Sequence, residues 1–531
     1  MRLPWWSTGS LALLLILLLA GLPLLAIALE AGQINLPSVL SNAYTQRVIR
    51  FSIVQAALST LLSLGLAIPV ALALSHEPRF PGRSTLITLY SLSLVIPTVV
   101  AIFGIVAVYG RTGWFNTFLT SLSIEPLSLY GLNGILLAHV FFNMPFATRV
   151  LLQSLDGIPG EQWRLATQLG MPYRSRFRHI EWPALRPSLP GLTALIFALC
   201  FTSFAIVMTL GGGPRATTIE VAIYQALRFD FDLNMAVTLA CIQLVLCTVL
   251  MVFSTLLARH IDSTIGFSGL LKPVRWRPTN THRWIGILTI SIATMFVLLP
   301  LLGLVFATAN TKFLTVITDS LTLLAIGNTL VTAVVSAFLS VALALGLLIS
   351  TRHLRVRLHH ERAGIWLQLA GNIILVLPPL VLGTGLFLLL QPLADVFSLA
   401  LLLVIAINSL TALPFVVRML EAPMMQAGRQ HDRLLQSLGI DAWHRWRIID
   451  WPLLRRPIGL ALAVAATLSA GDLTAIALFG SERFKTLPLL LYQRMGSYRL
   501  DEAAVTAGIL LALCLFLFAS LQRIIGGRAH A

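Results

Sequence analysis

Two stretches of this 531-residue chain decide its fold: IPGEQWRLATQLGMPYRSRFRHIEWPALRP at residues 158–187, and HDRLLQSLGIDAWHRWRIIDWPLLRRP at residues 431–457. In each, a Leu-Gly pair is followed by an aromatic residue seven positions after the glycine and by a proline six positions later. The shared positions are Leu169, Gly170, Phe177 and Pro183 in the first copy and Leu438, Gly439, Trp446 and Pro452 in the second. Such a match at fixed spacing indicates an internal duplication.

Each copy is expected to begin with a short helix that carries apolar residues on one side. These residues are Leu165, Ala166 and Leu169 in the first copy and Leu434, Leu435 and Leu438 in the second. The glycine suits the left-handed position just after a helix. The prolines are expected to end a second helical piece before the chain re-enters the membrane. A single copy would fit an amphipathic helix lying on a membrane surface, but two copies favour an element that docks on a partner.

The composition of the remaining chain is that of a membrane protein. Hydrophobic residues make up 57% and charged residues 11%, far from the averages of soluble domains. The four cysteines lie within apolar runs, where thiols behave as small hydrophobic groups; they are Cys200, Cys241, Cys247 and Cys514. They therefore indicate neither a disulfide framework nor a metal site.

Twelve segments are long and apolar enough to cross a bilayer core of about 30 Å as helices. They lie near residues 10–29, 49–74, 86–109, 131–155, 190–210, 235–258, 284–307, 323–350, 367–391, 396–420, 457–479 and 502–524. The first could be a signal peptide, but its length favours an uncleaved span. The predicted fold is an all-α polytopic membrane protein with about twelve transmembrane helices, surrounded by membrane lipid.

The basic residues indicate how these spans are oriented. The formal net charge is +16, and most of the 37 Lys and Arg residues lie between apolar runs. They are concentrated in the loops that follow even-numbered spans, and such loops are cytoplasmic by the positive-inside rule. Both termini are therefore expected in the cytoplasm, and nucleic acid is not an expected partner.

The repeat divides the chain into two six-span halves. We expect a first half at 1–258 with its repeated core at about 48–258, a cytoplasmic linker at 259–283, and a second half at 284–531 with its core at about 323–524. The repeat matches each span of the first half to the span six places later. Because six is an even number, the two copies cross the membrane in the same direction, and a substrate pathway is expected near the axis that relates them.

The sequence lacks a recognisable nucleotide-binding or metal-binding motif. A phosphate-binding loop needs a Gly-Lys pair, and none of Lys272, Lys312 and Lys485 follows a glycine. Residues 359–361, His-His-Glu, have no metal-ligand spacing. We therefore expect no metal, no cofactor and no catalytic residues, and a subunit that is not an enzyme.

Polar residues within the predicted spans are candidates for the pathway, because ionisable groups at that depth are costly. Asp472 is the clearest, and its repeat counterpart is Phe204. The alternative is that Asp472 bonds Ser469 or a neighbouring helix. Interhelical hydrogen bonds account for four further polar residues, His139, Asn143, Asn372 and Asn408. Three prolines, Pro97, Pro378 and Pro379, are expected to kink spans rather than to contact substrate.

The two repeated loops resemble the EAA loop of binding-protein-dependent ABC importer permeases, in which Glu-Ala-Ala precedes the Leu-Gly pair. Here those positions read Arg-Leu-Ala at residues 164–166 and Arg-Leu-Leu at 433–435. The resemblance implies that both loops dock on a cytoplasmic ATPase, expected to be a dimer. The missing acid puts a specific salt bridge to that ATPase in doubt.

Four segments are similar to the thiamine permeases of this family, whose two halves are fused. They are VYGRTGWF at 108–115, ILLAHVFFNMP at 135–145, GGGPRATTIEVAIYQAL at 211–227 and TLPLLLYQRMGSYR at 486–499. The resemblance implies a bacterial inner-membrane importer of thiamine or its phosphate esters, with a periplasmic thiamine-binding protein. A ferric-iron permease shares the architecture. An ion-coupled secondary transporter or a channel would leave the duplicated loops unexplained.

The expected mechanism is alternating access by rocking of the halves. Docking helices at about 158–170 and 427–439 would approach one another when the ATPase closes around ATP. Outward-facing loops at about 111–130, 211–233 and 480–501 would receive the binding protein.

Overall fold

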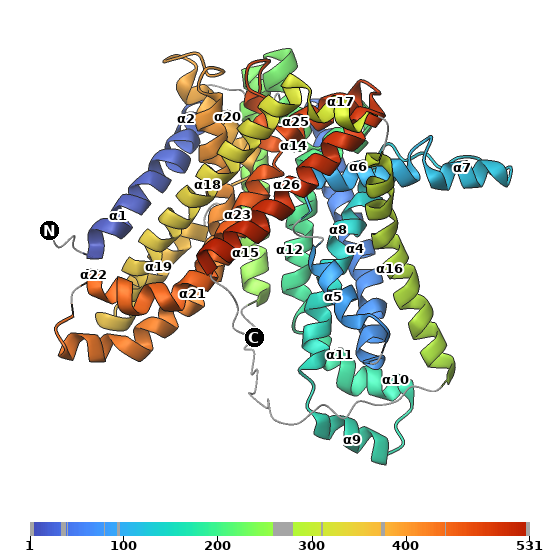
Figure 1. Cartoon of the computed structure of the whole chain (residues 1–531), viewed down its shortest axis with the longest axis horizontal. Helices are drawn as coiled ribbons and strands as arrows, with labels where there is room; N and C mark the ends of the chain where they lie inside the picture. The colour runs from blue at the N-terminus through green and yellow to red at the C-terminus, as the bar shows by residue number, and fades with distance from the viewer. Residues whose placement is uncertain are drawn as a thin grey trace.

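The computed structural model describes residues 5–32, 39, 41–78, 80–92, 96–258, 280–309, 312–372, 377–440 and 442–526. Helix is the regular secondary structure of these residues, and no strand occurs among them (Figure 1). Ten helices of the described chain are long and apolar enough to cross a membrane, or eleven if one pair bent by 60° counts as a single span. The all-α polytopic fold is confirmed, whereas the count of twelve spans is not.

The first half contains α1 (Trp5–Ile16), η1 (Leu17–Gly21), α2 (Leu22–Ala31), α4 (Ala43–His76), α5 (Arg83–Leu92), α6 (Thr98–Tyr109), α7 (Trp114–Ser121), α8 (Leu132–Asp156), α9 (Gly160–Gln168), α10 (Tyr173–Arg176), η2 (Phe177–Glu181), α11 (Trp182–Leu185), α12 (Leu189–Phe201), α13 (Phe204–Leu210), η3 (Pro214–Ala216), α14 (Ile219–Gln225), η4 (Ala226–Asp230) and α15 (Leu233–Ala258).

The second half contains α16 (Asn280–Thr308), α17 (Phe313–Ile317), α18 (Ser320–Arg352), η5 (His353–Arg357), α19 (Glu361–Asn372), α20 (Pro379–Leu390), α21 (Ala400–Ser437), α22 (Ala442–Arg445), η7 (Trp446–Asp450), α23 (Trp451–Ala470), α24 (Thr474–Phe479), α25 (Leu487–Gly496) and α26 (Leu500–Gly526). The boundaries of the two halves remain a prediction, and residues 259–279 of the expected linker lie outside the described residues.

Prolines explain why the predicted spans at 86–109 and 367–391 are broken. Pro97 directly precedes α6 with an extended ψ of 134°, and Pro378 directly precedes α20 with an extended ψ of 140°. Pro379 occupies the first turn of α20, where its missing N–H costs nothing. A proline lacks the N–H of a helix interior and forces the residue before it out of the helical region. These prolines therefore start new helices rather than kink continuous ones.

The duplication reappears in the contacts of the long helices α4 and α18. Their N-caps are Asn42 and Asp319, whose side chains accept hydrogen bonds from the second residue inside each helix. Farther along, the Ser52 hydroxyl of α4 accepts from the first N–H of α14 at 2.9 Å. The Thr329 hydroxyl of α18 accepts from the first N–H of α25 at 2.8 Å. Each half thus fixes the start of a short helix with one hydroxyl of its long helix.

The first span of each half packs on the other half. α1 lies against α18 and α2 against α20, while α16 lies against α4 and α6. Two glycines allow the closest approaches: a Cβ on Gly385 would lie 2.4 Å from the Pro23 carbonyl oxygen, and a Cβ on Gly104 would lie 2.4 Å from that of Pro300. A side chain at either position would push the exchanged helix away.

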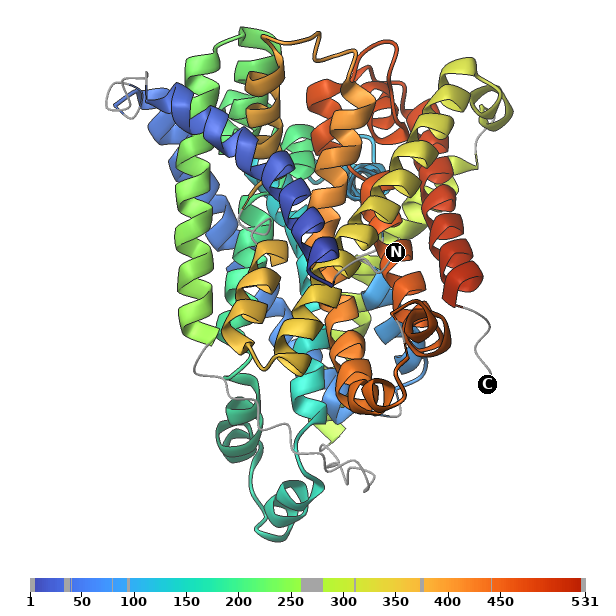
Figure 2. The ribbon, with the colours of Figure 1, turned by 90° about the vertical axis from the view of Figure 1, so that its left-hand side faces the viewer.

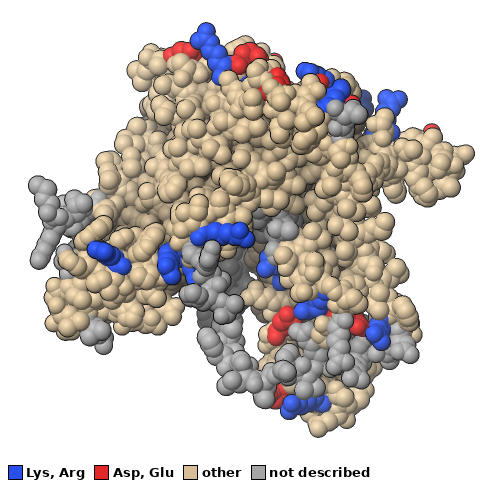
Figure 3. All heavy atoms as spheres, viewed as in Figure 1, with Lys and Arg blue, Asp and Glu red and all other residues tan. Residues whose placement is uncertain are grey.

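The helices converge at one end of the molecule and separate at the other. We call the end that carries α9 and α22 the loop end (Figure 1). There the space-filling view shows two lobes with a hollow between them (Figure 3). The perpendicular view shows that α9 projects farther than the end of α21 (Figure 2). The opposite end, with α17, α20 and α25, is where the halves come together.

Candidate functional site

The first repeated loop forms a separate short helix, as expected. α9 begins directly after Pro159, which together with Gly157 separates it from α8. Leu165 and Leu169 are 57% and 66% exposed, whereas Ala166 is buried with its neighbour Trp163. The predicted apolar residues are therefore divided, with two leucines on the surface and the alanine in the interior.

The second repeated loop differs from the expectation of a short separate helix. α21 runs without a break through Pro414 and Pro423 to Ser437, so the expected docking segment at 427–439 is the end of a 38-residue helix. The positions equivalent to Gly157 and Pro159 are Gln426 and Gly428. The helix therefore continues through the positions at which Gly157 and Pro159 separate α9 from α8 in the first half.

The apolar residues of the second loop are again divided between surface and interior. Leu438 is 63% exposed and Leu435 is buried. Leu434 belongs to α21, but its side chain lies outside the described residues. Each loop therefore presents at least one leucine at the loop end.

Both loops end in the same C-terminal cap. Gly170 and Gly439 have φ angles of +60° and +65°, as the sequence predicts. The following N–H groups, of Met171 and Ile440, donate to the carbonyls five residues earlier at 3.0 and 3.1 Å. This is the hydrogen bond of a Schellman cap, and it turns the chain sharply.

After its glycine, each loop forms one α-helical turn and one π-helical turn. The Phe177 and Trp182 rings lie 6.0 Å apart, and the Trp446 and Trp451 rings lie 6.2 Å apart. Pro183 and Pro452 stand in the first turn of the next helix, α11 and α23. The expectation that these prolines end a helix is therefore wrong, because the first turn tolerates a missing N–H.

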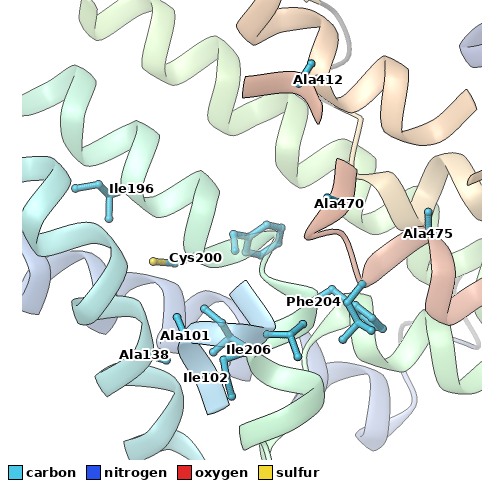
Figure 4. Packing of buried hydrophobic residues seen from close by; sticks show 14 of the residues in the cluster. Ala101, Ile102, Ala138, Ile196, Cys200, Phe204, Ile206, Ala412, Ala470 and Ala475 are labelled. Atoms are coloured by element: carbon cyan, nitrogen blue, oxygen red, sulfur yellow. The ribbon is translucent and has the colours of Figure 1, made fainter. Parts of the chain in front are cut away.

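Two of the three pathway candidates, Phe204 and Asp472, lie near the other half of the chain. Phe204 is buried in one apolar cluster with Ala470 and Ala475 of the second half (Figure 4), and its ring contacts Tyr224 at 5.4 Å. Both carboxylate oxygens of Asp472 accept hydrogen bonds, at 3.0 Å each, from backbone N–H groups at the start of α24. Among the described residues, the Asp472 carboxylate therefore caps α24 and does not bond a side chain of a neighbouring span. The capped helix α24 packs against α20 and α21.

Ser469 and three other polar candidates make interhelical contacts. Asn408 donates to the Ser469 hydroxyl at 3.0 Å and Asn143 donates to Cys200 Sγ at 3.3 Å. His139 lies 2.8 Å from the Ser59 hydroxyl and 2.7 Å from that of Ser203. The interpretation of these residues as links between helices is confirmed. The Asn372 side chain lies outside the described residues.

Sequence reasoning missed a contact that joins the halves away from the loop end. Arg228, in η4, donates to the Gly480 carbonyl at 2.8 Å, and its guanidinium lies 4.9 Å from the centre of the Phe397 ring. Arg228 directly follows the well-matched segment 211–227, which was the available signal. Which partner it would meet depends on the tertiary fold.

Comparison with known proteins assigns the family. The family described as "binding-protein-dependent transport system inner membrane component" matches residues 48–263 and 342–530, one segment in each half. The chain belongs to this family. Similar full-length relatives of this permease include "Thiamine transport system permease protein ThiP" from Brucella abortus (strain 2308), 44% identical over 530 residues, with 98% of this chain and 96% of the relative covered.

Two further relatives are similar to the chain to different degrees. The protein of the same name from Escherichia coli (strain K12) is 44% identical to the permease over 524 residues, covering 98% of this chain and 97% of its own. "Sulfate transport system permease protein CysW" from Synechococcus elongatus is 25% identical over 218 residues, which is 40% of this chain. The relatives are transport permeases, so the permease is a membrane subunit of a bacterial transport system.

Proposed function

We propose that this permease is the membrane-spanning subunit of an ABC importer that carries thiamine across the bacterial inner membrane. The observation that carries the proposal is the similarity, over nearly the full length of both chains, to relatives named thiamine transport system permeases. In this proposal a separate cytoplasmic ATPase supplies the energy and a periplasmic thiamine-binding protein delivers the substrate.

The two repeated loops are the proposed ATPase contacts. Leu165, Leu169 and Leu438 are exposed side chains at the loop end. Exposed apolar groups on short, well-capped helix ends are suited to fill a groove on a partner. The residues proposed to shape the first loop are Leu165, Ala166, Leu169, Gly170, Phe177 and Pro183, and those for the second are Leu434, Leu435, Leu438, Gly439, Trp446 and Pro452.

Orientation and conformation follow from this assignment. If the loops meet a cytoplasmic ATPase, the loop end is cytoplasmic, which agrees with the excess of basic residues in those loops. The hollow between the lobes then opens to the cytoplasm (Figure 3), and the Arg228–Gly480 contact closes the outer side. The structure described here would be the inward-open state of an alternating-access cycle.

Asp472, Phe204 and Ser469 are proposed to contribute to the pathway. Thiamine carries a cationic thiazolium ring, which a carboxylate attracts and an aromatic face can contact. Asp472→Ser keeps an oxygen that can cap α24 but removes the charge. We expect it to lower thiamine uptake; unchanged uptake would contradict the pathway role.

The decisive experiment measures uptake of labelled thiamine into proteoliposomes that contain this permease and its candidate ATPase, with the binding protein outside. The lumen holds ATP or a non-hydrolysable analogue, and a matched preparation lacks the ATPase. We expect accumulation only with ATP and ATPase together. ATP-driven uptake of ferric iron or another solute instead would refute the substrate, and uptake driven by an ion gradient without the ATPase would refute the transporter class.

A further inference from the structure

A buried acid joins the first loop to the long helix α4. Glu181, within the first repeated loop, is the last residue of η2, and His76 is the last residue of α4. The His76 Nε2 atom lies 2.5 Å from Glu181 Oε1, and the glutamate is almost completely buried. The Tyr173 ring lies edge-on to the His76 ring at 6.1 Å. The loop is thereby fixed to the loop-end tip of a helix that crosses the membrane.

The second half makes the corresponding contact with different side chains. Asp450 is the last residue of η7, and Arg352 is the last residue of α18. Arg352 Nη1 donates to Asp450 Oδ1 at 3.1 Å, with both side chains buried. The same Arg352 also donates to Met424 Sδ at 3.3 Å. Arg352 therefore connects α18 both to η7 of the second loop and to α21.

A further arginine extends this contact to the docking segment itself. Arg445, in α22, donates to Asp450 Oδ2 at 3.1 Å and pairs with Asp432. Asp432 lies seven residues before Gly439, within the end of α21 proposed to dock. Asp432, Arg445, Asp450 and Arg352 thus form a continuous series of charges from the docking segment to α18, in which Arg445 is partly exposed and the other three are buried. In the first half Trp163 occupies the position of Asp432, and Arg176 occupies that of Arg445.

The two contacts lie at similar places in the two halves, although their residues differ and Arg352 aligns with Ser75, one residue before His76. Glu181 and Asp450 each precede a Trp-Pro pair, and His76 and Arg352 each end the long helix of their half. A buried ion pair contributes little net stability compared with apolar residues of the same shape. Each half keeps a contact between the loop and the long helix, but with a different acid and a different base. The feature that the halves share is therefore the position of the contact, rather than its contribution to stability.

We propose that Glu181 with His76, and Asp450 with Arg352, are positioning residues that transmit movement of the docking loops to the transmembrane helices α4 and α18. When the ATPase closes, each loop is displaced, and the buried pair makes the tip of the long helix follow. Networks of packed charges with defined partners carry coupling between distant sites in this way. The inference rests on the proposed docking of both loops on an ATPase.

The test compares thiamine taken up per ATP hydrolysed for Glu181→Gln, Asp450→Asn and the wild-type permease, each in complex with the ATPase. Both substitutions keep the shape of the side chain and remove its charge. We expect this ratio to fall by about tenfold, within the range of network contributions to coupling, while ATP hydrolysis continues. A His76→Arg/Glu181→Asp double variant installs the pair of the second half and should retain the wild-type ratio, which a simple loss of packing would not predict.

Arg494 provides a matched control. It is a buried arginine away from the loop end, and its Nη2 donates to Asp319 Oδ2 at 2.9 Å. Asp319→Asn should lower thermal stability without changing the ratio. An unchanged ratio in Glu181→Gln and Asp450→Asn, or an equal fall in Asp319→Asn, would overturn the inference. If the wild-type permease shows no ATPase-dependent uptake, the proposed function fails instead, and the two failures are distinct.

Discussion

The two repeated loops have the same cap but different attachments to the membrane helices. In the first half, Gly157 and Pro159 separate α9 from α8, so the docking helix is a distinct body. In the second half, α21 continues from the span into the docking segment. A separate helix can change its angle to the span, whereas a continuous helix moves as one piece with it. If both loops dock on an ATPase as proposed, the two halves would receive its displacement through a joint on one side and through a continuous helix on the other.

Substitution of the capping glycines should have the largest effect on both loops. Gly170→Arg and Gly439→Arg each place a side chain at positive φ, which costs about 1–2 kcal/mol, beside the exposed leucines. We expect transport to be uncoupled from ATP hydrolysis while the protein remains in the membrane. Gly82→Arg is the control, because Gly82 also has positive φ, +74°, but lies between α4 and α5. Wild-type transport by both loop variants would show that the docking assignment is wrong.

A single substitution can make the attachment of the second loop to its membrane helix resemble that of the first loop. Gly428 corresponds to Pro159, and Gly428→Pro should remove a hydrogen bond of α21 and kink the helix at a cost of about 3 kcal/mol, in addition to the two prolines that α21 already contains. We expect it to lower the uptake per ATP, whereas Pro159→Ala should change that ratio little, because α9 is already positioned by its own buried residues.

Gly428→Ala is needed as the control for crowding, since a Cβ at this position would lie 2.9 Å from Arg352 Cδ. Equal effects of the proline and alanine variants would mean that crowding, and not helix continuity, matters.

The first span of each half packs on the other half, and substitutions at these two crossings should have similar effects. Gly104→Ala and Gly385→Ala should each destabilise the permease by about 1–3 kcal/mol through overpacking. Thermal unfolding in detergent measures this as a lower midpoint for both. Gly327→Ala is the control, because a Cβ there meets no atom within 4 Å. A lower midpoint in only one of the two variants would argue that the two crossings are not equivalent.

The smallest expected effects concern the N-caps of the long helices. Asn42→Ala removes one capping bond and should cost about 1 kcal/mol. Asp319→Ala should cost more, because Asp319 also pairs with the buried Arg494. Thermal unfolding of both variants side by side measures the difference, and equal losses would mean that the Arg494 pair contributes nothing beyond the cap.

Sequence reasoning predicted the features that depend on local chemistry. The apolar composition indicates the membrane fold, and Gly170 and Gly439 indicate the caps because few other residues adopt positive φ. The count of twelve spans is not confirmed. Among the described residues, the predicted span at 190–210 belongs to a pair of helices bent by 60°, and the predicted span at 367–391 contains the shorter apolar helix α20, which begins after Pro378. The docking segment of the second half was predicted as separate by analogy with the first, yet no residue between Met425 and Ser437 is a proline.

The candidate site was predicted in part, because tertiary partners are not encoded by hydropathy. Leu165, Leu169 and Leu438 are at the loop end, but Ala166 and Leu435 face the interior. Asp472 is visible in the sequence as an acid in an apolar run, whereas its capping bonds depend on where α24 begins. The exchange of α1 and α16 between the halves leaves no local pattern, since a lipid-facing and a helix-facing apolar surface have similar composition.

The exchanged first span has a consequence for the order of biogenesis. α1 and α2 are synthesised first, but α18 and α20, against which they pack, come from the second half of the chain. At a synthesis rate of about 5–20 residues per second, the N-terminal span waits for roughly tens of seconds before its partners exist. Its leucine-rich surface suits a helix that must first be stable in lipid alone. The first half therefore completes its assembly only when the second has been made, and joining both halves in one chain ensures that this partner always follows.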